Sequence, residues 1–271
     1  MRLLLTKVVA FVVRDHTEAS SYRLSFILRF PRALFTVLVF YFLSGLIGGT
    51  ASPHLAEYGG SYFPWVLVGI ALAAYLDTSL TTFAYLIRNA QMTGTMEALL
   101  ATQTQLPTII LGSSVYSFFS TSAIVLLYLA TGALFFGVDL SSANVPAAAL
   151  VLLLSIAAFS ALGIVSAAFT VVFKRGEAIL GAFTQVSFLL GGVYFPVSVL
   201  PNGLQAVAVL LPITHALDAM RFALLRPEDL AGMGAELVAL ALFALVALPF
   251  SVWMFDRAVH HAKMSGTLGQ Y

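Results

Sequence analysis

Residues 189–225 read LLGGVYFPVSVLPNGLQAVAVLLPITHALDAMRFALL, and the interpretation of the whole chain depends on this stretch. It leaves an apolar segment through two adjacent glycines and then meets three prolines, Pro196, Pro201 and Pro212. Proline lacks an N–H group and clashes with the preceding helical turn, so the stretch predicts short apolar helices that cannot each cross a bilayer. Broken apolar segments of this kind are typical of positions where a membrane protein lines a pathway.

The composition indicates an integral membrane protein. Of 271 residues, 60% are hydrophobic and only 9% are charged, and the mean hydropathy is +0.97. Soluble domains carry about 25% charged residues. The apolar runs are much longer than a barrel strand of ~9–11 residues and do not alternate, which favours an all-α fold. A net charge of +1 gives no reason to expect nucleic acid as a partner, and the absence of cysteine excludes disulfides and thiolate metal sites.

Six long apolar spans are expected. Their approximate bounds are 31–50, 62–86, 107–136, 146–173, 177–196 and 232–255, which together make a transmembrane domain over residues 31–255. Residues 1–30 mix five basic residues with apolar residues near helical spacing, which predicts an amphipathic helix on the membrane surface. A basic tail that only sets the topology is the alternative. No small-residue cleavage site follows the apolar run Val8–Val13, so we expect this segment to be retained.

The basic residues predict the orientation. With six spans and both termini in the cytoplasm, 11 of the 13 Lys and Arg residues lie on the cytoplasmic side, and only Arg221 and Arg226 lie outside. Such a distribution follows the positive-inside rule. The tail at 256–271 is then cytoplasmic, and the protein is expected in the cell (inner) membrane.

Both termini can lie in the cytoplasm only if the number of spans is even, so a seventh span over residues 198–226 is excluded. We interpret this stretch as two short re-entrant helices in the outer leaflet. Asn202, three residues before Gln205, suits a helix start at Gly203, and Thr214 is a candidate cap for the second helix. Arg221 has Asp218 three residues before it, at a spacing that suits a helical ion pair.

The cytoplasmic loop 89–106 reads NAQMTGTMEALLATQTQL and is too polar to span a membrane. Thr95 suits a helix N-cap, Glu97 lies in the favourable first turn, and Met96, Leu99 and Leu100 give one apolar side. The predicted short helix either docks to a partner in the cytosol or rests on the membrane surface.

Catalytic motifs are missing from the sequence. It contains no G-x-S-x-G, no H-E-x-x-H and no Walker A sequence, so any ATP-driven work must come from another chain. Asp77 is the one acid deep in a span, where a charged carboxylate costs ~2.5–3.5 kcal/mol and therefore needs a partner, water or a proton. It marks either a polar pathway, a proton site or a helix-packing residue.

Small residues predict close helix contacts at two places. Gly45 and Gly49 form a GxxxG pattern on the first span, and Gly163 with Ala167 forms a similar face on the fourth. Both patterns suit packing within the bundle or dimerisation.

Four motifs, taken together, resemble the membrane subunit (permease) of type-2 ABC exporters. They are GTMEALLATQTQLP at 94–107, KRGEAI at 174–179, GGVYFPVSVLP at 191–201 and LPITHALDAMR at 211–221. The resemblance covers nearly the whole chain. It implies a homodimer, or a pair of similar permeases, served by two separate ABC ATPase subunits, with membrane lipids around it. ATP and Mg²⁺ would then bind the partner ATPase, and this chain would carry no cofactor and no metal.

The resemblance also implies roles for particular residues. The coupling helix that fits a cleft on the ATPase corresponds to Gly94, Thr95, Met96, Glu97, Ala98, Leu99 and Leu100, with a second contact at Lys174, Arg175 and Glu177. The exit region corresponds to Gly191, Gly192, Tyr194, Phe195, Pro196, Pro212, His215, Asp218 and Arg221, the last three being interpreted as a polar patch that stabilises its helix.

The expected function is therefore export of a lipid, a glycan-linked lipid or polysaccharide, or a drug-like molecule by a subunit that is not itself an enzyme. Two alternatives remain open from the sequence. One is an ion- or proton-coupled carrier or channel that uses Asp77, and the other is a structural membrane subunit that recruits partners through its small-residue faces.

Overall fold

The computed structural model describes residues 12–17, 23–47, 52–94, 106–173, 177–228 and 230–264. Regular structure within these ranges is helical, which confirms the all-α prediction. In chain order the elements are α2 (Arg23–Ile47), the 3-10 helix η2 (Ser52–Tyr58), α3 (Tyr62–Met92), α5 (Leu106–Phe135), α6 (Val145–Val172), α7 (Glu177–Leu190), the 3-10 helix η3 (Val197–Val199), α8 (Asn202–Ala208), α9 (Pro212–Leu225) and α10 (Leu230–Met264). Residues 12–17 are also helical.

Within the described ranges, five helices are long and apolar enough to cross a membrane: α2, α3, α5, α6 and α10. A sixth is obtained if the bent pair of α8 and α9 counts as one span. This confirms a helical membrane protein with many spans, and α5 and α6 agree closely with the third and fourth predicted spans.

Three predicted bounds differ from the structure. The fifth span, expected at 177–196, is the helix α7 of 14 residues, which ends at Leu190 and is about 21 Å long. The helix that carries the first span begins earlier than expected, because α2 starts at Arg23 and contains Pro31 in its interior. Its part that is apolar enough to cross a membrane, Phe30–Ile47, agrees with the predicted span, and residues 23–30 belong to the same helix. The last span continues to Met264, so most of the predicted tail is helical.

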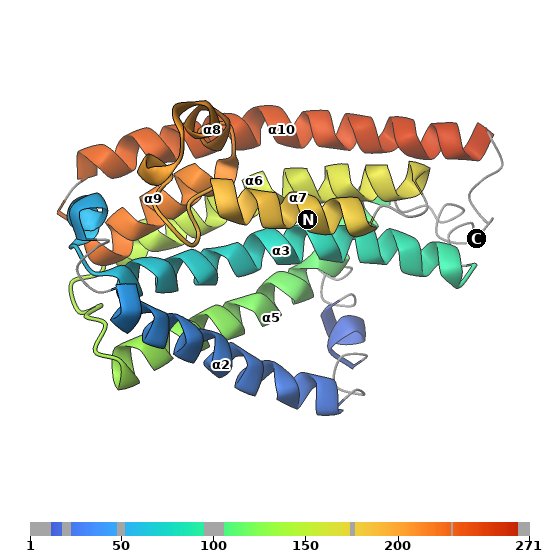
Figure 1. The fold of residues 1–271 in the computed structure, drawn as a ribbon. Coiled ribbons are helices and arrows are strands. Elements are labelled where there is room, and N and C mark those ends of the chain that lie inside the picture. Colours follow the sequence, from blue (N-terminus) through green and yellow to red (C-terminus); the bar gives the residue numbers. More distant parts are fainter. Residues whose placement is uncertain are drawn as a thin grey trace.

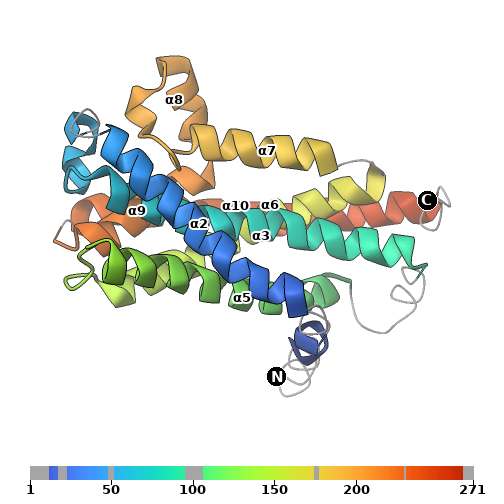
Figure 2. The ribbon, with the colours of Figure 1, turned by 60° about the horizontal axis from the view of Figure 1, so that its bottom comes forward.

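The helix α3 is central. Figures 1 and 2 show α3 running the length of the bundle, with α5, α6, α7 and α9 around it and α2 crossing obliquely. Its end at Met92, the end of α6 at Val172 and the end of α10 at Met264 lie together at one end of the molecule, which we call the inner end. The opposite end, which we call the outer end, holds η2, α9 and the connection between α5 and α6.

Close packing between α3 and α6 depends on Gly163. A Cβ atom at this position would lie 2.5 Å from the carbonyl oxygen of Ser79, so only glycine lets the two backbones approach this far. The Ser166 hydroxyl then donates to the Leu80 carbonyl oxygen over 2.8 Å. Gly45, in contrast, has nothing within 4 Å of its Cβ position, so this half of the GxxxG pattern on α2 makes no close contact within the chain, and Gly49 lies outside the described residues.

Replacing Gly163 with alanine is expected to destabilise the fold by about 1–3 kcal/mol, because α3 and α6 would have to move apart. Gly45→Ala is the matched control and should leave the stability unchanged or raise it slightly, since alanine favours a helix. Thermal unfolding of both variants in detergent measures the difference. Equal midpoints for the two variants would contradict the assignment of Gly163 as a contact glycine.

Candidate functional site

The chain turns sharply after α7, at the Gly191-Gly192 pair. Gly192 has a φ of +84°, a left-handed conformation that favours glycine, and the Val193 N–H donates to the Phe188 carbonyl oxygen over 3.2 Å. This is the hydrogen-bond pattern that ends a helix at a glycine. The turn therefore stops α7 well short of a full span and directs the chain toward the outer end.

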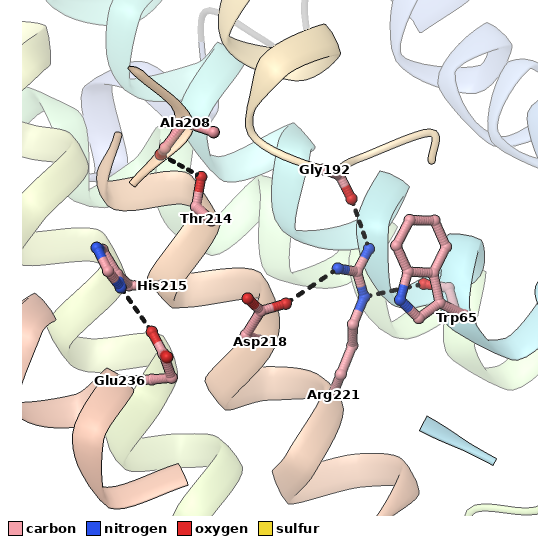
Figure 3. Close-up of polar contacts among 8 residues, drawn as sticks. All are labelled: Trp65, Gly192, Ala208, Thr214, His215, Asp218, Arg221 and Glu236. Carbon is pink, nitrogen blue, oxygen red and sulfur yellow. Dashed lines mark hydrogen bonds and ion pairs between the residues drawn. The ribbon is translucent and has the colours of Figure 1, made fainter. Parts of the chain in front are cut away.

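Two short helices follow the turn, as expected, and they meet at an angle of 82°. α9 begins at Pro212, in its first turn, where the missing N–H has no intrahelical partner to lose. The predicted cap at Thr214 is wrong, because its hydroxyl donates to the Ala208 carbonyl oxygen over 2.7 Å and so joins α9 to the end of α8 (Figure 3). The helix α8 starts at Asn202, and the Gln205 amide donates back to the Leu200 carbonyl oxygen over 2.7 Å.

Arg221 of α9 is the most deeply buried charge in the described part of the chain, with an exposed fraction of 1%. Its guanidinium donates from Nη2 to the Gly192 carbonyl oxygen over 2.8 Å, from Nη1 to Asp218 over 3.4 Å and from Nε to the Trp65 carbonyl oxygen over 3.4 Å (Figure 3). The cation also lies over the Trp65 indole ring, 3.7 Å from its centroid. One side chain thus joins α9 to α3 and to the turn after α7.

The predicted pairing of Arg221 with Asp218 is present, but Arg221 is part of the core and not of a surface patch. The sequence did not point to its other partners. They are two backbone carbonyls, one at Trp65, more than a hundred positions away in the sequence, and one at Gly192. Gly69 makes room for this arrangement, because a Cβ atom there would lie 2.5 Å from the Val193 carbonyl oxygen and 3.2 Å from Arg221 Nη2.

His215 joins α9 to the last span. Its Nδ1 lies 2.5 Å from Glu236 in α10, and its Nε2 lies 2.8 Å from the Val209 carbonyl oxygen. Both ring nitrogens therefore face acceptors, an arrangement that the doubly protonated imidazolium satisfies in full because both of its N–H groups donate. Glu236 was not predicted as a partner, although it is an acid near the start of an otherwise apolar span.

The remaining residues of the predicted exit region lie around an aromatic hollow near the outer end. The Tyr194 ring stacks on Phe40 of α2 with centroids 5.8 Å apart, and its carbonyl oxygen accepts a hydrogen bond of 2.8 Å from the Tyr62 hydroxyl. Phe195 lines the same hollow. Pro196 precedes η3 as its N-cap residue. The structure brings these residues together, and the hollow is lined by α2, α3 and the segment after α7.

The predicted coupling residues fall mostly outside the described ranges. Gly94, with a φ of +67°, follows the end of α3, whereas Thr95 to Leu100 and the pair Lys174 and Arg175 are not described. Glu177 is the first residue of α7. The ends of α3 and α6, which these two segments follow in the sequence, nevertheless lie at the inner end of the bundle (Figure 1).

Asp77 lies near the middle of α3, on a side that is exposed at the surface of the single chain. Two hollows meet at this residue, one between α3 and α5 and the other between α3 and α7. The Arg32 side chain of α2 interacts electrostatically with the carboxylate. This partner was not predicted, because the two residues are far apart in sequence and come together only when α2 and α3 pack.

Replacing Arg221 with methionine is expected to destabilise the protein by about 3–5 kcal/mol, because Asp218 and the Gly192 carbonyl would lose their partner in the core. The matched control is Arg226→Met in the residue that follows α9, where a partly exposed pair with Glu228 contributes less than about 1 kcal/mol. Thermal unfolding in detergent compares the two variants. A tolerated Arg221→Met substitution would show that the guanidinium does not hold the outer end together.

Comparison with known proteins agrees with this architecture. Residues 6–225 match the family described as ABC-2 type transporter. The chain is also similar to Nodulation protein J of Sinorhizobium fredii (strain NBRC 101917 / NGR234), with 25% identity over 234 residues that cover 79% of this chain and 87% of that protein. Because the family match covers most of the sequence, the chain belongs to the ABC-2 type transporter family as a membrane-spanning permease subunit.

Proposed function

We propose that this permease subunit works in an ATP-driven exporter, paired with a second permease and served by two separate ATPase subunits. The observation that carries the proposal is the gathering of the ends of α3, α6 and α10 at the inner end, where the sequence continues into the regions 94–100 and 174–177. These regions contain the predicted coupling residues, and the sequence has no Walker A motif of its own. The positive-inside distribution supports a cytoplasmic position for this end.

The proposed direction of transport follows from the cytoplasmic position of the inner end. ATPase closure would push on the segment from Gly94 to Leu100 and on the connection between α6 and α7. Both are attached directly to helices of the bundle, since Gly94 follows α3 and Glu177 begins α7. Movement of α7 would reach its glycine turn and the helices α8 and α9, which we propose to line or gate the exit. The cargo is a lipid, a glycan-linked lipid or polysaccharide, or a drug-like molecule.

The double substitution Glu97→Ala with Leu100→Ala is expected to weaken association with the ATPase by about 2 kcal/mol or more, roughly 30-fold. Co-purification of the two proteins from membranes measures the loss, and ATP-dependent transport should fall with it. Leu245→Ala, on the exposed apolar side of α10, is the matched control and should co-purify normally. The thermal unfolding midpoint of the double variant should remain that of the parent chain.

Two results would contradict the proposal. One is transport by the reconstituted chain in the absence of any ATPase. The other is transport driven by a proton gradient alone and stopped by Asp77→Asn, which would favour a proton-coupled carrier.

A further inference from the structure

The two halves of α3 have different environments. From Tyr62 to Leu76 nearly every residue is buried, the exceptions being Pro64 and Ala74. From Asp77 onward, one side of the helix is open at the surface of the chain, and Asp77, Thr81 and Tyr85 follow one another at a spacing of four residues along it. Residues four apart lie on the same side of a helix, so they form one continuous stripe that runs toward the inner end.

This stripe is polar where a lipid-facing helix surface would be apolar. Asp77 lies about 15 residues, or roughly 22 Å of helix, from the outer end of α3 at Tyr62, which is a depth well inside a bilayer of ~30 Å. Ionisable and polar side chains at this depth face protein or a water-filled space, because hydrocarbon cannot solvate them. The stripe therefore needs water or other polar groups beside it.

Hollows lie on both sides of the stripe, and both include Asp77 and Thr81. One, of about 310 Å³, lies between α3 and α5 and is lined by hydroxyl groups that include Thr78, Ser117 and Thr121. The other, of about 320 Å³, lies between α3 and α7 and extends to Tyr85 and Arg88. The lining thus combines many hydrogen-bond donors and acceptors with exposed aromatic rings, Tyr85 being 60% exposed.

At Asp77 the charges are nearly balanced, whereas Arg88, which also lines the second hollow, lies eleven residues farther along α3, roughly 16 Å toward the inner end. The Asp77 carboxylate is opposed by Arg32 of α2, with which it interacts electrostatically. A site with one carboxylate, one guanidinium and several hydroxyls does not select strongly for an anion or a cation. It suits an uncharged group with many hydroxyls, which can donate to the carboxylate and accept from the guanidinium and the hydroxyl groups.

From this geometry we infer that the stripe of Asp77, Thr81 and Tyr85 is a water-filled entry groove, and that Asp77 binds the hydroxyl-rich head group of an amphiphilic substrate at its closed end. The apolar part of such a molecule would remain in the lipid beside α2 and α7, whose outer surfaces are apolar. The inference rests on the proposed transport function, but the groove itself exists without an ATPase and is tested without one.

The chain has no cysteine, so single cysteines report on single positions. Thr81→Cys and Tyr85→Cys are prepared in membrane vesicles and treated with a charged, membrane-impermeant thiol reagent from the side of the inner end. The reagent attacks the thiolate, which forms in water and not in hydrocarbon. Both positions should react about tenfold faster, or more, than Leu245→Cys on the exposed apolar side of α10, and Met264→Cys at the inner end serves as the fully accessible reference.

Binding is tested by protection of Thr81→Cys from the reagent. Octyl glucoside, octyl phosphate and octyltrimethylammonium share one apolar chain and differ in the head group, and each is added below its micellar concentration. Octyl glucoside should protect best. Adding Asp77→Asn should weaken that protection about tenfold, as expected for the loss of one charge-assisted hydrogen bond. Asp256→Asn, at an exposed position near the inner end, is the control and should leave it unchanged.

Each contrary outcome has a distinct meaning. Labelling of the stripe no faster than Leu245→Cys overturns the water-filled groove while leaving the proposed ATPase coupling intact. Disulfides between copies at Thr81→Cys show that a second copy covers the stripe and overturn the groove as well. Equal protection by the three probes, or protection insensitive to Asp77→Asn, overturns the assignment of the head group. Loss of ATPase association alone affects only the proposed function.

Discussion

The outer end of this protein depends on a buried guanidinium. Removing the charge of Arg221 from water costs several kcal/mol, and this cost is offset only if good acceptors surround it. The acceptors come from three places: the Gly192 carbonyl after α7, the Trp65 carbonyl in α3 and the Asp218 carboxylate in α9 itself. The arginine is therefore satisfied only when α3, α9 and the glycine turn are correctly placed together, so it selects this arrangement over others.

Small residues make that arrangement sterically possible. Gly69 allows the segment after α7 to approach α3, Gly192 adopts the left-handed turn, and Gly191 leaves room for Ile213 of α9. His215 adds a second connection, from α9 to α10 through Glu236. The outer end is thereby held by polar contacts between four segments, whereas the inner half of α3 has an open polar stripe. A permease that admits its cargo from the inner side and controls release at the outer side would need this difference.

The fold class and the break after α7 could both be predicted from the sequence. Six long spans were expected, whereas five helices in the described residues are long and apolar enough to cross a membrane, or six if α8 and α9 count as one span. Long apolar runs require helices, since only internal hydrogen bonds satisfy the backbone in lipid. The glycine pair and Pro212 mark local conformations that depend on the residues themselves. Bounds were less predictable at Pro31 and in the fifth span, because helix ends depend on packing and on turn geometry as well as on hydropathy. The coupling residues Thr95 to Leu100 remain predictions from the family resemblance, which the family match supports.

The sequence by itself determined that Arg221 and Asp218 lie one helical turn apart and that Asp77 lies deep in a span, since helical spacing and apolar length are local properties. Only the tertiary structure decided that Arg221 belongs to the core, that Glu236 pairs with His215 and that Arg32 interacts electrostatically with Asp77. These contacts join residues far apart in the chain. Their partners are backbone carbonyls or single charges without a sequence pattern, and they meet only when the helices pack.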